Sequence, residues 1–275
     1  MITPLYGQMG VIKLGLGGTQ PVLPNISGLQ LWLDSADATT LYDATSGGNL
    51  VSADGATVAR WQDKSGNGRH ATQGTANARP LLKTSVFNSK NVIRFDGSND
   101  FLSVPTSSGL NFGTSGFSVF ISLRILRNSN NTTGILSKDD YAGTNTYKGF
   151  LINRYDTAGG YGVETRNRVS GVGPSANARW NQTNILTNTS YMFGAERDGR
   201  VCRFFVNGLQ RSSATEASAV DLTNNVALTI AALNGFLPGQ FANLDISEIL
   251  IYNQVLTTSE RTSVQNYLNE KWAIY

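Results

Sequence analysis

The sequence has little charge for its length. Charged residues make up 15% of 275 residues, and 22 lysines and arginines nearly balance 19 aspartates and glutamates, for a formal net charge of +3. This balance argues against a nucleic-acid partner, because proteins that bind nucleic acids carry a clustered basic surface. The low charge density also argues against a disordered, highly charged tail protein.

The residues that most often carry metal or nucleophilic chemistry are scarce. One cysteine, Cys202, cannot form an internal disulfide, so disulfides do not build this fold. With one histidine, His70, a zinc site is not expected. We interpret His70 as a structural or surface residue and Cys202 as an inert, strand-borne hydrophobe rather than a nucleophile.

Long apolar runs are also missing. No window approaches the roughly 18 apolar residues of a membrane helix, so we expect no membrane insertion. The first 18 residues do not form a secretory signal, because their only charge, Lys13, lies inside the apolar part and glycines interrupt the run. The sequence therefore predicts synthesis in a host cytoplasm without a signal peptide.

Small and turn-forming residues are abundant instead. The chain holds 29 glycines, 26 asparagines, 26 threonines and 25 serines, together more than a third of it. This composition is typical of many short strands joined by turns. The length suits one all-β sandwich of about 200–250 residues with an appendage.

Period-two alternation supports this all-β interpretation. Phe117, Val119, Ile121, Leu123 and Ile125 alternate with Ser118, Phe120, Ser122 and Arg124, which predicts a strand. In the same way Leu29, Leu31 and Leu33 alternate with Gln30, Trp32 and Asp34. Two turn signals, Asp198-Gly199 and Asn207-Gly208, predict tight hairpin connections.

One helix is predicted near the C-terminus, at about residues 258–272. Thr257 and Glu260 have the spacing of a capping box, in which each side chain satisfies an unpaired backbone amide of the other. Val264, Tyr267, Leu268 and Trp272 fall on one face. We expect this face to pack on the sandwich.

Residues 1–26 differ from the rest. They hold three of the seven prolines, five glycines and a single charge, and their apolar residues follow no period. One interpretation is that these residues are a disordered leader. The other is that they form an extended arm that docks on a partner or a neighbouring subunit. We favour the arm, because exposed apolar residues promote association. The docking residues would be Tyr6, Val11, Ile12, Leu14 and Leu16.

Five stretches occur in an order that resembles a known fold family. They are Gly28–Asp34, Trp61–Thr72, Val92–Pro105, Glu196–Gly208 and Asp245–Tyr275. Over residues 27–275 the chain resembles the concanavalin A-like, laminin-G-type jelly-roll domains. The resemblance implies an all-β, two-sheet antiparallel jelly-roll sandwich of the kind found in bacteriophage structural proteins and bacterial surface proteins, often carbohydrate-binding and often with calcium.

Enzymes of this fold place Glu-x-Asp-x-x-Glu on one strand, and the segment from Asn243 to Glu248 is the nearest match. Asn243 stands where the nucleophile is needed, and an amide cannot form a covalent glycosyl intermediate. We therefore predict a structural strand and no enzyme. Glu248 falls on the face of Leu244 and Ile246 unless a bulge intervenes, and if buried it should be hydrogen-bonded.

Calcium is the one metal that the sequence suggests. Asp96, Asn99 and Asp100 supply oxygen ligands within five residues, and hard cations prefer such ligands. Plain turn formation needs the same residue types, so both interpretations stay open.

A sugar site needs exposed rings with polar neighbours. Trp180, Tyr147 and Tyr161 offer rings, and Arg166 could hold an acidic group. The alternative is that these rings fill the sandwich; Trp180, which precedes a polar run, is the one we expect to be exposed.

Together these features predict a non-enzymatic bacteriophage virion protein, either a capsid decoration or a tail or fibre component. Residues 1–26 would bind other virion proteins, and the jelly roll would face outward and bind host surface polysaccharide. A homo-oligomer is expected, because closed symmetric assemblies are the norm. A carbohydrate-binding module or adhesin of a bacterial surface protein is the alternative, and a glycoside hydrolase is a remote one.

Overall fold

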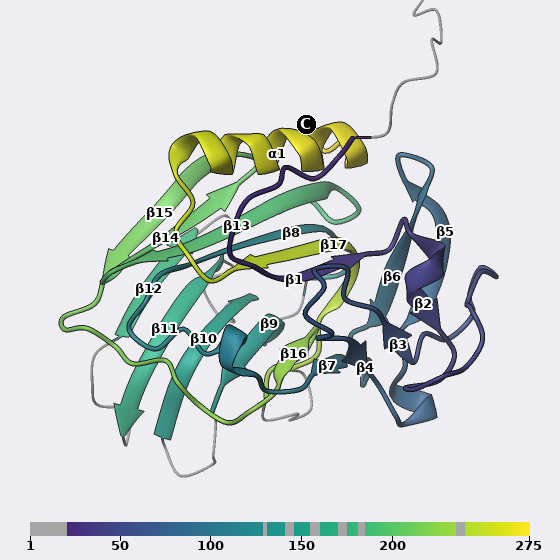
Figure 1. The fold of residues 1–275 in the computed structure, drawn as a ribbon, viewed down its shortest axis with the longest axis horizontal. Coiled ribbons are helices and arrows are strands. Elements are labelled where there is room, and N and C mark those ends of the chain that lie inside the picture. Colours follow the sequence, from purple (N-terminus) through teal and green to yellow (C-terminus); the bar gives the residue numbers. More distant parts are fainter. Residues whose placement is uncertain are drawn as a thin grey trace, which may run out of the picture.

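The computed structural model describes residues 21–128, 131–140, 146–154, 160–169, 175–180, 185–234 and 240–275, without the side chains of residues 146 and 166–169. This part of the chain forms two antiparallel sheets packed face to face, and one α-helix lies against the outside of the first (Figure 1). The predicted two-sheet antiparallel sandwich with a short C-terminal helix is therefore confirmed.

Sheet A is the layer next to the helix. Its strands follow the order β15-β14-β13-β8-β17-β6-β5, and β1 pairs with the second half of β17 while the first half pairs with β6. The long strand β17 thus holds three neighbours in register. The strands are β1 (Leu29–Asp34), β5 (Leu81–Phe87), β6 (Lys90–Asp96), β8 (Phe117–Ile125), β13 (Ser190–Asp198), β14 (Val201–Val206), β15 (Leu209–Thr215) and β17 (Asn243–Tyr252).

Sheet B forms the other layer, in the order β12-β11-β10-β9-β16-β7-β4-β3-β2. Strand β16 lies between β9 and β7, far from both in sequence, so the chain crosses between the layers as jelly rolls do. The strands are β2 (Leu41–Tyr42), β3 (Arg60–Trp61), β4 (Ala71–Thr72), β7 (Leu102–Val104), β9 (Thr133–Asp139), β10 (Thr146–Arg154), β11 (Tyr161–Val169), β12 (Ser175–Trp180) and β16 (Leu228–Ile230).

The predicted local patterns form as expected. In β8 the alternating residues from Phe117 to Ile125 face the core between the sheets, whereas Phe120 faces the helix. Gly199 turns β13 into β14 with a φ of +58°. Asn207 and Gly208 both have positive φ values, +51° and +77°, as a tight two-residue hairpin turn requires.

The core between the sheets is apolar, with a polar contact at one end. The rings of Phe112, Phe117 and Phe150 pack with centroids 4.8 to 5.4 Å apart. Beside this core Arg197 and Glu216 form an ion pair with both side chains fully buried. The pair connects β13 to the segment that follows β15.

The helix α1 (Thr258–Trp272) begins at the predicted capping box. Thr257 accepts the N–H of Glu260, whose carboxylate accepts the N–H of Thr257. Its predicted apolar face packs on the outer face of sheet A, which confirms that the helix covers the sandwich. This outer cluster includes Phe87, Val92, Phe120, Met192, Leu250, Tyr252, Val264, Tyr267, Leu268 and Trp272.

Residues 21–26 run beside α1 without regular structure, and a turn at residues 27–28 leads into β1 (Figure 1). Leu23 and Ile26 pack against the outer cluster, and Val22 is 83% exposed. The predicted docking residues Tyr6, Val11, Ile12, Leu14 and Leu16 lie outside the described residues. Among the helices that are described, none is long and apolar enough to span a membrane.

Candidate functional site

Strand register separates the residues predicted to bind sugar. Tyr161 pairs with Trp180 across β11 and β12, and both lie on the side of the sheet that faces the core. Tyr161 is 2% exposed, its ring centroid is 5.4 Å from that of Phe193, and burial raises its pKa. The prediction of Tyr161 as a sugar-stacking ring is therefore wrong, because its ring fills the sandwich.

Trp180 is half-buried rather than freely exposed. It packs against the edge of the core, and the guanidinium carbon of Arg211 lies 5.6 Å from the centre of its ring. Tyr147 is half-buried in β10, where it pairs with Arg168. Arg166 takes the register position opposite Gly149, and its side chain lies outside the described residues. Tyr147 and Trp180 pair with opposite ends of β11, so these two rings do not share one site.

The outer face of sheet B carries buried polar atoms that the sequence did not mark. Asn153 in β10 is fully buried, and neither its Nδ2 nor its Oδ1 has a hydrogen-bond partner among the described residues. Ser137 in the adjacent strand β9 is 1% exposed, and its Oγ also has no partner in the described part of the chain. Buried polar atoms normally have partners, so Asn153 and Ser137 are exceptions within the described residues.

The residues predicted as calcium ligands form a turn that uses their oxygens internally. Asp96 Oδ1 accepts the backbone N–H groups of Ser98, Asn99 and Asp100. Asp100 Oδ2 accepts the N–H of Asp96, and burial together with the Asp96 charge raises the pKa of Asp100 to about 6. Within the described chain no three His, Cys, Asp or Glu side chains cluster as metal ligands. This geometry favours the turn interpretation, and calcium binding stays a prediction.

His70 and Cys202 each make a hydrogen bond within the fold. His70 Nδ1 accepts the backbone N–H of Asp63. Cys202 is fully buried next to the Thr165 hydroxyl, and burial raises the pKa of its thiol to about 11. A thiol with so high a pKa is a poor nucleophile at neutral pH.

The strand that carries the segment from Asn243 to Glu248, β17, has both acids of that segment on the outer face of sheet A. A bulge between Ile246 and Glu248 puts Glu248 on the outer face, opposite the core-facing Ile246. Asp245, fully buried, accepts hydrogen bonds from the guanidinium groups of Arg94 and Arg124. Both acids of the motif are therefore covered and engaged.

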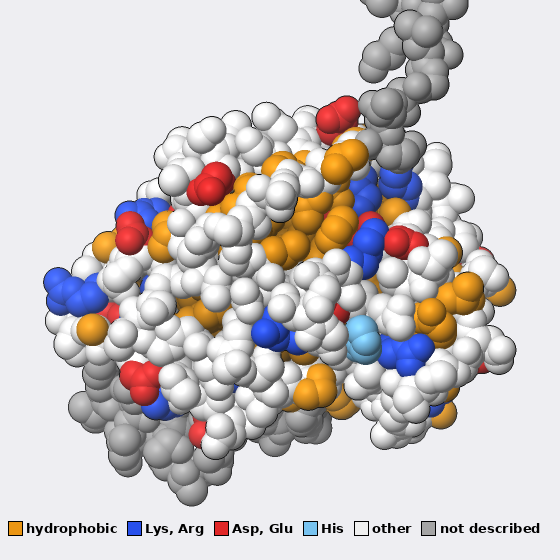
Figure 2. Space-filling view, in the orientation of Figure 1, with side chains coloured by type: hydrophobic (Ala, Val, Ile, Leu, Met, Phe, Trp, Pro, Cys, Tyr) orange, Lys and Arg blue, Asp and Glu red, His pale blue; other side chains and the backbone are white. Residues whose placement is uncertain are grey.

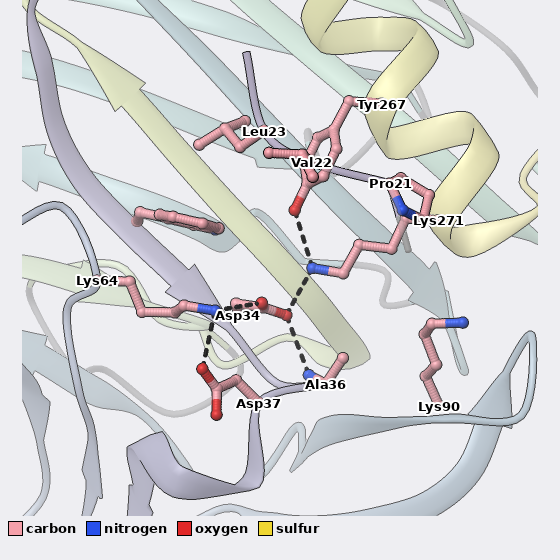
Figure 3. Close-up of a pocket in the computed structure, with 11 residues that line it drawn as sticks. Pro21, Val22, Leu23, Asp34, Ala36, Asp37, Lys64, Lys90, Tyr267 and Lys271 are labelled. Atoms are coloured by element: carbon pink, nitrogen blue, oxygen red, sulfur yellow. Dashed lines mark hydrogen bonds and ion pairs between the residues drawn. The ribbon is translucent and has the colours of Figure 1, made fainter. Parts of the chain in front are cut away.

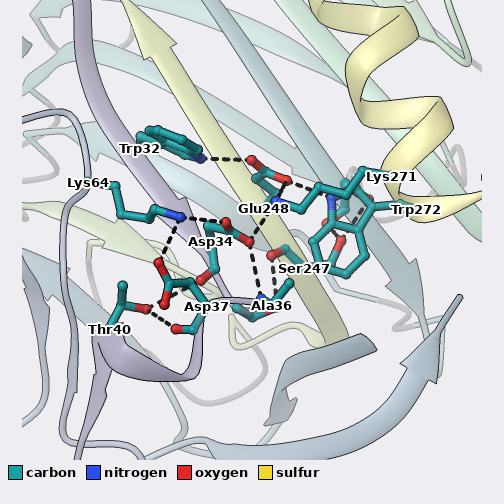
Figure 4. A network of polar contacts seen from close by, with 12 residues as sticks. Trp32, Asp34, Ala36, Asp37, Thr40, Lys64, Ser247, Glu248, Lys271 and Trp272 are labelled. Carbon is teal, nitrogen blue, oxygen red and sulfur yellow. Dashed lines mark hydrogen bonds and ion pairs between the residues drawn. The ribbon is translucent and has the colours of Figure 1, made fainter. Parts of the chain in front are cut away.

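Glu248 is the centre of a polar network under α1 (Figure 4). Its Oε1 accepts from Trp32 Nε1 and the Tyr267 hydroxyl, both at 2.7 Å, and its Oε2 accepts from Lys271 Nζ at 2.8 Å and Trp272 Nε1 at 2.6 Å. The expectation that a buried Glu248 would be hydrogen-bonded is confirmed. Burial and the nearby Asp34 raise the pKa of Glu248 against the opposing effect of Lys271 and Tyr267.

A cavity of about 510 Å³ lies above this network, between β1 and α1 (Figure 3). The space-filling view shows a band of hydrophobic side chains along α1 with basic and acidic groups beside it (Figure 2). Trp32 and Tyr267 supply rings, and the chain at residues 21–23 forms one wall. The remaining lining residues are Asp34, Ala36, Asp37, Lys64, Lys90 and Lys271.

The charged groups of this cavity are fixed mainly by one another. Lys64 Nζ lies 2.8 Å from Asp34 Oδ2, 2.9 Å from Asp37 Oδ2 and 4.4 Å from the centre of the Trp32 ring. Burial alone would lower the pKa of Lys64, but the hydrogen bonds and charges of the two aspartates raise it overall. The side-chain ammonium of Lys90, on the opposite side of the cavity, makes no hydrogen bond or ion pair within the described residues (Figure 3).

The sequence carried a partial signal for this cavity. The alternation of β1 placed Trp32 and Asp34 away from the core, and the helical period placed Tyr267 toward the sheet. Lys64, Lys90 and Lys271 had no such signal, because they come from a loop, a hairpin and the last turn of α1. Only the folded chain brings these segments together.

The strand order and the packing of two sheets around one core define the class, a lectin-type jelly-roll sandwich. The chain belongs to the concanavalin A-like lectin/glucanases superfamily, whose laminin-G-type profile matches residues 96–260. Comparison with curated protein sequences gave no significant match.

Several solved structures share the fold at low sequence identity. The binding domain of Paraclostridial Mosquitocidal Protein 1 has a TM-score of 0.59 at 17% identity, over 78% of this chain and 51% of that one. The ligand-binding domain of botulinum neurotoxin serotype D, solved with N-acetylneuraminic acid, has a TM-score of 0.56 at 14% identity, over 87% and 50%. Domain 4 of the Geobacillus stearothermophilus arabinanase AbnA, solved with arabinotriose, has a TM-score of 0.53 at 18% identity, over 78% and 100%.

This chain spans about half of the mosquitocidal binding domain and about a third of the Trypanosoma rangeli sialidase, a further neighbour with a TM-score of 0.53 at 14% identity. At these identities the likeness concerns the fold.

Proposed function

We propose that this domain binds glycans without cleaving them, as a structural protein of a bacteriophage particle. The cavity between β1 and α1 carries the proposal, because it combines the partly buried ring of Trp32 with charged side chains in about 510 Å³. Pockets of this size that mix rings with a few placed polar groups are typical of small-ligand sites. The sugars bound by two structural neighbours support a saccharide as the ligand class.

The polar groups left unengaged in the cavity are hydrogen-bond donors. Among the described residues, Lys64 Nζ contacts two carboxylates and keeps one N–H available, and the Lys90 ammonium keeps all three. Hydroxyl, ring and carboxylate oxygens of a sugar accept such bonds. Because Glu248 holds the Trp32 indole in place, the ring loses little freedom when a sugar stacks on it.

The absence of hydrolysis is part of the proposal. Retaining glycosidases need two carboxyl groups about 5–5.5 Å apart on either side of the scissile bond. Here Asp245 binds two guanidinium groups and Glu248 accepts four donors, and both side chains are fully buried. Neither acid has an oxygen free to attack or protonate a sugar.

Attachment to the particle would use residues 1–26, which carry one charge. The described end of this arm, residues 21–23, forms a wall of the cavity and lies beside α1. Mass spectrometry of purified particles tests this part, and a chain without residues 1–20 should fold but fail to join them. Glycan binding by a chain absent from every particle would instead favour an adhesin or carbohydrate-binding module of a bacterial surface protein.

A glycan array, run with calcium and with a chelator, tests the binding site. We expect Trp32→Phe to weaken binding at least tenfold, about 1.4 kcal/mol, because the smaller ring loses stacking area and its bond to Glu248. Trp180→Phe is the matched control and should bind as the wild type does. The site is refuted if the two variants behave alike, and loss of binding in the chelator would support calcium.

A further inference from the structure

We propose that Lys271 and Asp34 condense to an isopeptide bond, with Glu248 as the acid–base group. The bond would join the last turn of α1 covalently to the end of β1. This reaction is independent of glycan binding, because it needs only side chains of the folded chain.

The three reacting groups already touch. Lys271 Nζ lies 2.8 Å from Asp34 Oδ1 and 2.8 Å from Glu248 Oε2 (Figure 4). The amine is therefore next to the carboxyl group that it would acylate and next to a second carboxylate that can take its proton. General acid–base catalysis requires this hydrogen-bond reach before any other property.

Water is largely excluded from the three groups. The side chains of Lys271, Asp34 and Glu248 are 8%, 6% and 0% exposed. The ring centres of Trp272 and Tyr267 lie 5.0 and 5.3 Å from Lys271 Nζ. Low exposure of the three groups opposes hydrolysis of the product. Burial also raises the pKa of Glu248, which suits a carboxylate that must take up a proton.

The second oxygen of Asp34 has a cation in the right place. Lys64 Nζ lies 2.8 Å from Asp34 Oδ2, the oxygen that gains negative charge when the amine attacks the carboxyl carbon. A donor fixed at a developing oxyanion lowers the barrier. The N–H of Ala36 holds Asp34 Oδ1, at 3.1 Å, and so orients the carboxyl plane.

The step balances without an outside reagent. Glu248 takes one proton from the Lys271 ammonium, and the amine attacks Asp34 Cγ to form the C–N bond. The C–Oδ1 bond then breaks, and Oδ1 leaves as water with two of the three ammonium protons, one delivered by Glu248. The products are an amide and one water molecule, and Glu248 returns to its carboxylate form with no change in oxidation state.

Two other buried cations of the described chain, Arg197 and Lys138, lack either a nucleophilic amine or a neighbouring carboxyl group. Arg197 meets Glu216 fully buried, but a guanidinium stays protonated and is no nucleophile. Lys138 Nζ contacts the Asn224 and Val226 oxygens, where the described residues place no carboxylate. The Lys271 site therefore differs by its combination of amine, carboxyl and acid–base group.

Intact mass spectrometry of the full-length chain, folded at neutral pH and then denatured, tests the proposal. We expect the wild type to be lighter by one water molecule, and fragmentation to find the Asp34 and Lys271 peptides joined. Glu248→Gln should keep the full mass, and Lys271→Arg should keep it while retaining a cation that supports folding. Lys83→Met, a lysine change on β5 outside the cavity, should still lose water.

A wild-type chain that keeps its full mass after prolonged incubation overturns the proposal, as does a lost water that maps to other residues. The wild-type measurement stands even if a variant fails to fold. Glycan binding by an unlinked chain would leave the proposed function intact and refute only the bond.

Discussion

Glu216→Gln should destabilise the domain strongly, although it replaces only one oxygen by an amide nitrogen. The Glu216 carboxylate accepts Arg197 Nε and Nη2, both at 2.9 Å, the Thr165 hydroxyl at 2.6 Å and the N–H of Val220 at 3.2 Å. Glutamine keeps the shape, but its NH₂ group faces donors where the carboxylate offered acceptors. Arg197 then keeps its charge in a fully buried site without a counter-ion.

The size of this effect follows from the burial of both partners. Removing one partner of a buried ion pair costs about 3–5 kcal/mol, because the remaining charge stays desolvated. Domains of this kind are stable by only about 5–15 kcal/mol, so the variant would lose a large share of its stability. Arg197 also donates to the carbonyl groups of Gly113, Ser115 and Val220, which tie two loops to β13. These loops should loosen in the same variant.

Urea unfolding followed by tryptophan fluorescence measures the loss. Glu270→Gln is the matched control, because Glu270 is exposed on α1 and makes no ion pair within the described residues, and it should unfold like the wild type. The double variant Arg197→Leu/Glu216→Leu should lose less than the two single changes added together. A loss below about 1 kcal/mol for Glu216→Gln would refute the view that this pair is desolvated.

Three further predictions concern other buried groups. Asn153→Leu should raise the free energy of unfolding by about 1–3 kcal/mol, since it removes a buried amide that has no partner among the described residues; a lower Tm would contradict this. Burial lowers the pKa of Lys138 to about 8, whereas the unfolded chain holds that proton to about 10.5, so stability should rise with pH between these values. Urea midpoints at pH 7 and 9.5 should show this rise in the wild type but not in Lys138→Met. The Cys202 thiol, with a pKa of about 11, should resist alkylation at pH 8 in the native protein and react in urea; native labelling would count against its burial.

The fold was predictable where the signal is local. The alternation in β8, the capping box of Thr257 and the Asn207-Gly208 turn each depend on residues within a few positions of one another, and each formed as expected. Register between distant strands has no such signal. The pairing of β11 with β12 turned Tyr161 and Trp180 toward the core, and the sequence left that side undecided.

A β-bulge in β17 decides on which face of sheet A Glu248 lies. In an unbroken strand Glu248 would face the core with Ile246, and the bulge moves it to the face that α1 covers. A bulge reverses every later side chain of a strand, and its position depends on the partner strands rather than on the strand itself. The sequence could only state the two possibilities for Glu248.

The sequence by itself determined an all-β sandwich closed by one amphipathic helix, through its alternating apolar residues and its capping box. The presence of one cysteine determined that this sandwich is built without disulfides. The scarcity of charge and of histidine fits the same kind of domain. Those properties follow from composition and short-range periodicity, which the chain carries before it folds. Only the tertiary structure decided where chemistry is concentrated, because Trp32, Lys64, Glu248 and Lys271 come from four separate segments. Their contacts depend on strand order, one bulge and the docking of α1, and these are set by packing across the whole domain.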